Sequence, residues 1–161
     1  MARHTPKVAL VPSAFFDPAS AREILLRTVA LDREDKVEYI SLPELSAELV
    51  YSLSPDMEPS DVAEYPDMYH LLKKLPDIKD YNKILASYGD NVLTLVIAQG
   101  ENLLLANTFE AADFTTAEYF LFMAVKKLQL NPEVSVVHSM TDLSGEEEMS
   151  LYRYFKSVER L

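Results

Sequence analysis

The sequence predicts a mixed α/β protein, because segments with the period of a strand alternate with segments with the period of a helix. Three apolar runs between residues 83 and 106 are separated by turns that contain Gly89 and Gly100, which is typical of antiparallel strands. Two Ser/Thr-x-x-Glu patterns follow and mark helix starts, at Thr115 and Ser144, with a β-rich run between the two helices. The second half of the chain is therefore expected to form one βββαβα unit.

The first part of the chain begins with a short strand and a helix. Residues 7–11 form a β-rich apolar run that stops at Pro12. Asp17 is placed as the N-cap of a helix whose first position is Pro18, and both residue types favour those positions. Apolar residues then recur at helical spacing and give this helix one apolar face: Ala21, Ile24, Leu25 and Val29.

Residues 37–42 and 47–53 alternate well enough to form two further strands. Pro43 and Glu44, which lie between them, also suit the first turn of a short helix. Both interpretations of this stretch remain open.

Residues 54–66 contain three prolines and several acids, which predicts a loop or a connection between domains. Apolar residues at helical spacing then predict a short amphipathic helix over residues 68–75, ended by Pro76.

The three central runs predict an antiparallel meander. Gly89-Asp90-Asn91 and residues 99–101 form its two turns. The middle run is apolar on both faces apart from Thr94, as expected of a strand that is covered on both sides. The strands are expected at residues 83–87, 92–98 and 103–106.

Two helices and one strand follow the meander. Thr115 and Glu118 form a capping box, and Lys126 and Lys127 near the end of that helix complement its dipole. The next strand is expected at residues 133–137.

Ser144 and Glu147 cap the last helix. Its acids come first and its bases late, which is the order that the helix dipole favours, so the acidic run is expected to be structural. The acids are Glu146, Glu147 and Glu148, and the bases are Arg153, Lys156 and Arg160.

Composition limits the function classes. The 161 residues are 48% apolar and 25% charged, which suits one globular domain or two small ones. Without cysteine the chain forms no disulfide and no thiolate metal site. A net charge of −11 disfavours nucleic-acid binding, which depends on Lys and Arg. No signal peptide or membrane-spanning run is present, and we expect a cytoplasmic protein that binds no membrane.

No catalytic motif is present in the sequence. It lacks the phosphate-binding, dinucleotide-binding, serine-hydrolase and zinc-protease patterns, and its three glycines are too few for a glycine-rich phosphate loop. The spacing of His4, His70 and His138 suggests no metal site, and His138 is expected to be a hydrogen-bonded histidine at a strand end. Asp113 is expected to cap or turn the chain before a helix.

Three antiparallel strands, a helix, a strand and a helix follow in the order found in ribonuclease H-like folds, including the half-domains of actin-like ATPases. Particular segments strengthen that likeness: residues 11–16 before a helix, residues 49–52, and the strand at 104–109 followed by Asp113 and the pair Tyr119-Phe120. With these segments the chain resembles a family of uncharacterised Bacteroidetes proteins, domain-of-unknown-function family 3822, from about Lys7 to Leu161.

The resemblance implies an actin-like ATPase fold with no assigned activity. Members of the family are longer, and a further N-terminal segment supplies the first strands of their first half-domain. We therefore expect residues 1–75 to form an incomplete first half-domain and residues 81–161 to form a ribonuclease H-like half-domain. Either the chain is a fragment, or its first part pairs with other strands, such as those of a second copy.

The resemblance also implies where a nucleotide would bind. Active actin-like ATPases carry an acid at the end of the first strand and glycines in the following turn. Here Ala86 or Ser87 stands where the acid is expected, and Tyr88 crowds the turn. The adenosine loop would fall near residues 139–145, which contain one glycine, Gly145. These substitutions deny close backbone approach to phosphate.

Two functional hypotheses follow. The first is a non-catalytic binding or scaffold protein with a degenerate actin-like fold, no cofactor, and a protein partner or a second copy as its target. Its interaction surface would lie around Phe109, Phe114 and Tyr119, although plain core packing also explains these aromatics.

The second hypothesis is a divergent actin-like ATP-binding protein or ATPase with Mg-ATP as cofactor. The candidate nucleotide-binding residues are Ser87, Gly89, Asp90, Asn91 and Gly145. A nucleic-acid enzyme on the same fold is disfavoured by the charge and by the absence of acids within the strands.

Overall fold

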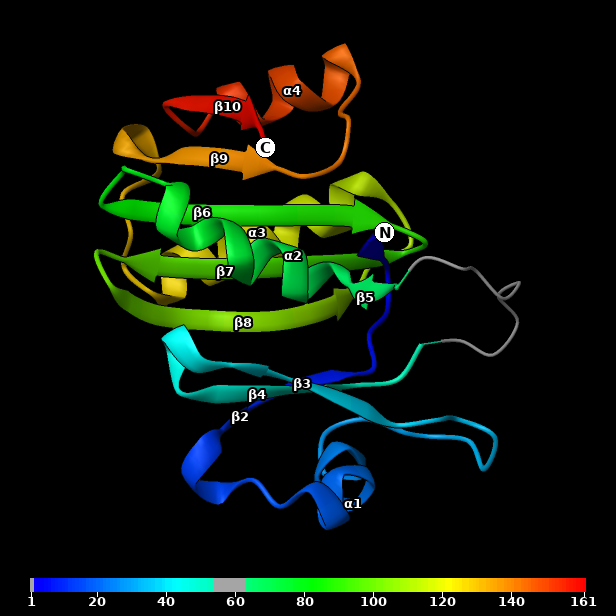
Figure 1. The fold of residues 1–161 in the computed structure, drawn as a ribbon. Helices are drawn as coiled ribbons and strands as arrows, with labels where there is room; N and C mark the ends of the chain where they lie inside the picture. The colour runs from blue at the N-terminus through cyan, green and yellow to red at the C-terminus, as the bar shows by residue number, and fades with distance from the viewer. Residues whose placement is uncertain (1, 54–62) are drawn as a thin grey trace.

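Two β-sheets, one of three strands and one of five, form the framework of the protein. The computed structural model describes residues 2–53 and 63–161. Figure 1 shows the three-stranded sheet beneath the five-stranded sheet, with helix α2 (Asp67–Lys74) in front of the larger sheet and α3 (Phe114–Lys127) behind it. The N-terminus lies at the end of the larger sheet where strand β6 (Asn82–Gly89) finishes.

The larger sheet has the strand order β10-β9-β6-β7-β8. Strands β6, β7 and β8 form the predicted antiparallel meander, and β9 and β10 extend the sheet as parallel neighbours of β6. The bounds of the four strands besides β6 are Val92–Gln99 for β7, Asn102–Glu110 for β8, Val136–Ser139 for β9 and Ser157–Arg160 for β10.

The turn between β6 and β7 has two residues in the left-handed region, Asp90 with φ 49° and Asn91 with φ 61°. Positive φ at both central residues is the geometry that matches the twist of a hairpin, and Asp and Asn tolerate it better than most residues. In β7, residues Val92 to Ala98 are all buried, which confirms the prediction of a strand covered on both faces.

The end of the chain differs from the prediction. Helix α4 (Gly145–Tyr152) begins with the predicted capping box: Glu147 N–H donates to Ser144 Oγ at 3.1 Å, and Ser144 N–H donates to Glu147 Oε1 at 2.8 Å. However, Arg153, Lys156 and Arg160 lie beyond this helix, and Arg160 belongs to strand β10, which pairs with β9. The sequence analysis placed these three basic residues late in the last helix, and that placement is wrong because the helix ends at Tyr152.

Two other boundaries are corrected. The N-cap of α3 is Asp113, whose Oδ1 accepts the N–H of Thr116 at 2.7 Å, so the predicted capping box of Thr115 and Glu118 does not start the helix. This confirms Asp113 as a capping residue. Strand β9 begins at Val136, because Pro132–Val134 forms a 3-10 turn in the first part of the predicted run.

The smaller sheet consists of β2 (Val8–Pro12), β3 (Glu38–Leu42) and β4 (Ala47–Tyr51), with β4 in the centre and all pairs antiparallel. A 3-10 turn at Pro43–Leu45 joins β3 to β4. The two predicted strands therefore form, and the helical turn suggested by Pro43 and Glu44 forms between them. Asp17 caps a 3-10 turn that leads into the short helix α1 (Ala21–Leu26).

Two small elements were not predicted. Strands β1 (Ala2–Arg3) and β5 (Tyr65–Pro66) pair in parallel, so the end of the predicted 54–66 connection is a strand. The rest of that connection, up to residue 62, lies outside the described residues.

The core has a layer on each face of the larger sheet. Side chains of α3 and α4 cover one face, where Ile84, Leu95 and Leu121 belong to one buried cluster. Helix α2 and the smaller sheet cover the other, where Leu49 and Leu85 share a second cluster. The division of the chain at residues 75–81 remains a prediction, but side chains from both sides of it pack into this second cluster.

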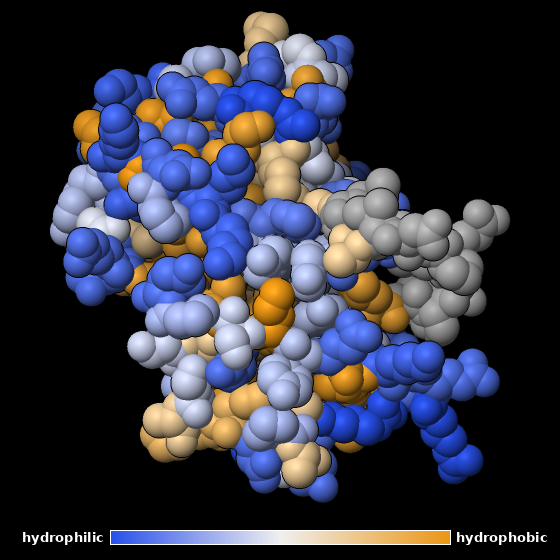
Figure 2. Space-filling view, in the orientation of Figure 1, coloured by the Kyte–Doolittle hydropathy of each residue, from blue (hydrophilic) through white to orange (hydrophobic). Residues whose placement is uncertain are grey.

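Hydrophilic side chains cover most of the face shown in Figure 2, and hydrophobic residues are scattered among them. Within residues 2–53 and 63–161, no helix has the length and apolar character needed to cross a bilayer.

Candidate functional site

Three polar side chains from distant parts of the sequence meet at the end of strand β6. Asp67 Oδ2 accepts a hydrogen bond from Ser87 Oγ at 2.6 Å and forms an ion pair with Nδ1 of His4. Asp67 is 2% exposed and Ser87 is fully buried, whereas the His4 side chain is 23% exposed. A buried carboxylate needs such partners, since an unpaired charge is costly away from water.

Local structure explains why these residues meet. Asp67 is the first residue of α2 and follows Pro66, a position where the helix dipole favours an acid. Side chains alternate along β6, so Ser87 lies on the same face as Leu85, the face that packs against α2. Pairing of β1 with β5 brings His4, the residue after β1, to the start of α2.

The ring of His4 also covers the last residue of β6. A Cβ added at Gly89 would overlap the His4 ring, with Nε2 as its nearest atom. Only glycine therefore leaves room for the histidine at this point of the hairpin.

Electrostatics favour the charged form of His4. The contact with Asp67 raises the pKa of the His4 imidazole, and the charges of Asp67 and Asp90 add to this effect, while partial burial opposes it. The neighbouring Arg3 donates to Glu64 Oε1 at 2.5 Å. Two successive basic residues therefore pair with acids: Arg3 with Glu64, which precedes α2, and His4 with Asp67, its first residue.

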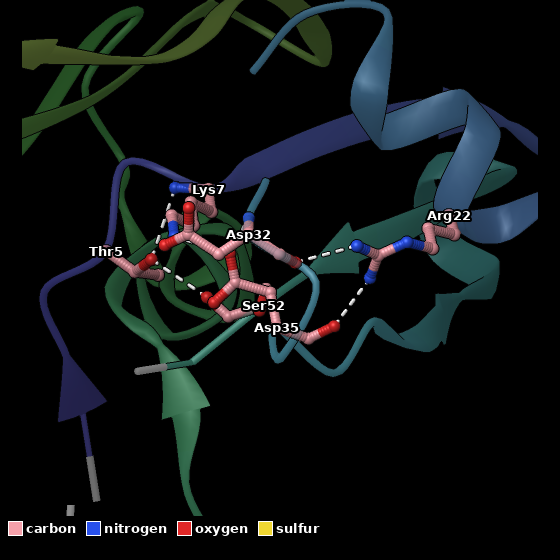
Figure 3. A network of polar contacts seen from close by, with 6 residues as sticks. All are labelled: Thr5, Lys7, Arg22, Asp32, Asp35 and Ser52. Carbon is pink, nitrogen blue, oxygen red and sulfur yellow. Dashed lines mark hydrogen bonds and ion pairs between the residues drawn. The ribbon is translucent and has the colours of Figure 1, made fainter. Parts of the chain in front are cut away.

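A second polar network anchors the continuation of this segment (Figure 3). Lys7 Nζ donates to Asp35 Oδ2 at 2.6 Å, and the same oxygen accepts the backbone N–H of Asp32 at 2.7 Å. These contacts lower the pKa of Asp35. Thr5 Oγ1 donates to the carbonyl of Ser52 at 2.9 Å, so the segment is held to strand β4's end as well.

Arg22 on α1 closes this network, as Figure 3 shows. Its two terminal nitrogens donate to the carbonyls of Asp35, at 2.6 Å, and Asp32, at 2.7 Å. The turn at residues 32–35 is thereby fixed between α1 and β2, which indicates a structural role for the network.

The five candidate nucleotide-binding residues lie toward one end of the larger sheet, in different surroundings. Ser87 is buried and bonded to Asp67, and Gly89 is under His4. Asp90 and Asn91 are exposed at the hairpin turn. Gly145 begins α4 and has open space where a Cβ would lie.

A hollow of about 450 Å³ adjoins the hairpin turn. Asp90 and Glu110 line it, and none of its lining residues is Lys or Arg. A negative hollow of this kind repels a phosphate group. Its lining residues are Pro6, Asp90, Asn91, Val92, Glu110, Ala111 and Ala112.

The loop over residues 139–145 adjoins β6 through two bonds: Met140 N–H donates to the Ala86 carbonyl at 2.8 Å, and Tyr88 N–H donates to Thr141 Oγ1 at 3.3 Å. The cavity between this loop and α3 measures about 30 Å³, which is the share of one water molecule in the liquid. Tyr88 and Phe114 are among its lining residues, and the Tyr88 hydroxyl donates to the Ala111 carbonyl at 2.8 Å. A nucleoside does not fit in it.

The three predicted interaction residues differ in exposure. Phe109 is partly buried and stacks on Phe120 with ring centroids 5.0 Å apart, and Phe114 packs edge-on against Tyr88. Tyr119 is 61% exposed and contacts Phe120. One turn later on the same face of α3, Met123 is 40% exposed.

A pocket of about 620 Å³ lies at the opposite end of β6, between the C-terminal end of α2 and the turn after β7. Its floor is apolar and includes Leu42, Leu72 and Ala98. Lys73 pairs with Glu44 at 3.3 Å, and Lys83 donates to the Gly100 carbonyl at 2.6 Å. The lining holds these two lysines and two glutamates, Glu44 and Glu101, so its formal charges balance and do not select one sign of ligand charge.

His138, the expected hydrogen-bonded histidine, is buried and lies 3.2 Å from Asp80 Oδ2 through Nε2. This confirms the prediction. Across residues 2–53 and 63–161, no group of three or more His, Cys, Asp or Glu side chains could hold a metal ion.

Sequence reasoning missed the cluster of His4 and Asp67. Neither residue belongs to a motif, and His4 precedes the first predicted strand. The sequence does place an acid, Asp67, directly after Pro66. That pattern predicts the start of a helix, but it does not predict a contact with His4.

Family comparison agrees with this fold. The model of a family described as "Protein of unknown function (DUF3822)" matches residues 2–158. The chain belongs to the DUF3822 family. The predicted family resemblance is therefore confirmed, and no curated protein matches the chain.

A solved structure extends the comparison. The crystal structure of a protein from Bacteroides thetaiotaomicron VPI-5482, described as having an actin-like ATPase fold and unknown function, superposes with a TM-score of 0.77 at 18% identity. The match covers 99% of this DUF3822 chain and 66% of that protein, so the chain spans just under two thirds of its length. At this identity the likeness shows the fold alone, and it confirms the predicted actin-like, ribonuclease H-like architecture.

Proposed function

We propose that this chain is a non-catalytic binding or scaffold protein with a degenerate actin-like fold. One observation carries the proposal: His4 and Asp67 occupy the end of β6, where the family resemblance implies that nucleotide phosphates would contact the chain. The His4 ring lies against Gly89, and the Asp67 carboxylate accepts a hydrogen bond from the hydroxyl of Ser87.

Phosphate binding requires free N–H donors, close backbone approach and positive potential. His4 blocks approach to Gly89, and its charge is already paired with Asp67. The hollow beside the turn carries Asp90 and Glu110, and the small cavity beside the 139–145 loop has no room for a nucleoside. These features all act against a bound triphosphate.

The surface of β8 and α3 offers an alternative mode of action by protein contact. Tyr119 and Met123 are exposed on one face of α3, and Tyr119 continues into the stacked pair of Phe120 and Phe109. Tyrosine, phenylalanine and methionine are enriched at the centres of protein interfaces. We propose that this surface, defined by Phe109, Tyr119, Phe120 and Met123, binds a second copy of the chain.

Thermal unfolding with and without Mg-ATP tests the absence of nucleotide binding. A ligand held at about ten to a hundred times its Kd stabilises a protein by about 1.4 to 2.7 kcal/mol. The proposal predicts no change in Tm at millimolar Mg-ATP beyond that caused by magnesium with inorganic phosphate. A saturable, ATP-specific rise in Tm would contradict it.

Light scattering over a range of concentrations tests the surface. Tyr119→Asp places a charge at its centre, and Tyr81→Asp is the matched control because Tyr81 is 70% exposed outside this surface. Wild type and Tyr81→Asp are expected to associate as concentration rises, and Tyr119→Asp is expected to remain monomeric. Equal behaviour of all three proteins would contradict the assignment of this surface.

A further inference from the structure

The N-terminal segment, residues 2–6, is fixed by a contact at nearly every residue. Arg3 pairs with Glu64 and His4 with Asp67. Thr5 Oγ1 donates to the Ser52 carbonyl at 2.9 Å, and the Pro6 carbonyl accepts from Thr108 Oγ1 at 3.4 Å. The segment therefore runs from the start of α2, past the β6–β7 hairpin, to strand β8.

His4 is the member of this segment whose charge can change near neutral pH, since histidine titrates there while arginine stays protonated. The charged groups around it are Asp67 on α2, Asp90 at the hairpin turn, and the adjacent pair of Arg3 and Glu64. Asp67 is the closest of them, and its carboxylate is almost completely buried.

We propose that residues 2–6 form a strap that is held over the β6–β7 hairpin while His4 is protonated and loosens when His4 loses its proton. The neutral imidazole no longer forms the ion pair with Asp67, so the charge attraction that holds the ring in place is lost. Loosening uncovers Gly89 and opens the cluster of Asp67 and Ser87 to solvent. This pH-dependent device rests on the same contact of His4 with Gly89 as the proposed function, and strap mobility tests it separately from nucleotide binding.

The sign of the pH dependence follows from linkage. The contact raises the pKa of His4 above its ordinary value of 6.5, so the closed strap binds the proton more tightly than the open strap. Closure is therefore fully favoured below about pH 6.5 and weakens as pH rises through the raised value. For each pKa unit between the closed and the open strap, the equilibrium constant for opening is about tenfold larger at high pH than at low pH.

Nuclear magnetic resonance of the whole chain tests the proposal. Carbon relaxation at the Cα–Hα groups of Arg3, His4 and Thr5 measures strap mobility, because carbon-bound hydrogens do not exchange with water. Order parameters are expected to fall from the rigid range, about 0.85, toward the flexible range, below about 0.6, as pH rises from 5.5 to 9. The midpoint should coincide with the titration of the His4 ring.

Two variants give the controls. His4→Gln keeps an uncharged donor, and its strap mobility should not change with pH. His138→Gln removes a buried histidine that lies beside a different carboxylate, that of Asp80, and it should retain the wild-type pH dependence.

Asp67→Asn is a third variant that does not alter the strap itself. It should lower the pKa of His4 toward 6.5 and loosen the strap even at pH 5.5. An order profile of the wild type that stays rigid from pH 5.5 to 9 would overturn the proposal, as would the same pH dependence in His4→Gln.

Discussion

The imidazole of His4 lies against Gly89, the last residue of β6, and a Cβ at this position would overlap the ring. The same ring pairs with Asp67, which in turn accepts the hydroxyl of Ser87. The end of the strand that begins the β6–β7 hairpin is thus filled by the protein's own side chains.

Asp67→Asn is predicted to destabilise the fold, because it replaces a buried anion that accepts from Ser87 and pairs with His4. Hydrogen bonds to charged groups contribute about 1.5–3 kcal/mol each, and a loss in that range is expected in the free energy of unfolding from urea titration. Asp77→Asn, at an exposed site, should change it by less than about 0.5 kcal/mol. Equal effects of the two substitutions would show that the cluster contributes nothing.

The pair of Lys7 and Asp35 is predicted to contribute stability that acid removes. Its contacts lower the pKa of Asp35 below the ordinary 3.8, so this stability is present above that pH and is lost as pH falls through the lowered value. The difference in urea midpoint between wild type and Asp35→Asn should be constant from pH 5 to 7 and shrink below about pH 4. A difference that grows on acidification would contradict this sign.

Leu49→Ala tests whether the two sheets unfold together. Leu49 on β4 is fully buried and belongs to the same cluster as Leu85 on β6. The substitution should cost about 2–5 kcal/mol and shift a single unfolding transition followed by both far-ultraviolet circular dichroism and tyrosine fluorescence. Two separate transitions, with only one of them shifted, would mean that the sheets are independent.

Ser144→Ala and Thr115→Ala distinguish a capping box that forms from one that does not. Ser144 Oγ accepts the N–H of Glu147, and its loss should cost about 0.5–2 kcal/mol. Thr115 lies inside α3, where Asp113 is the N-cap, so its replacement should change stability by less than about 0.5 kcal/mol. Urea titration of both variants measures this, and the reverse order would restore the sequence-based assignment.

The meander and the last capping box could be predicted from the sequence because their signals are local. Gly89-Asp90-Asn91 marks a turn whatever surrounds it, and Asp90 and Asn91 adopt the left-handed geometry. Ser144 and Glu147 need only one helical turn to bond each other. Asp113 and Thr115 were both local candidates for the N-cap of α3. The structure has Asp113 as the N-cap, because its carboxylate accepts the N–H of Thr116.

Strand β10 and the strap could not be predicted, because their structure depends on distant partners. Ser157–Arg160 has little apolar character, and its strand exists through pairing with β9. Strand β1 is two residues long and pairs with β5 far along the chain. The position of His4 likewise depends on its ion pair with Asp67, and a single sequence contains no signal for a contact between residues so far apart.

The most direct test of the account is a titration of the isotope-labelled chain with Mg-ATP, followed at the backbone amides of Gly89, Asp90 and Asn91. Because His4 and Asp67 fill the end of β6, these amide signals are predicted to stay in place up to millimolar Mg-ATP, apart from changes that magnesium alone reproduces. Saturable shifts at these three residues that require ATP would contradict the account.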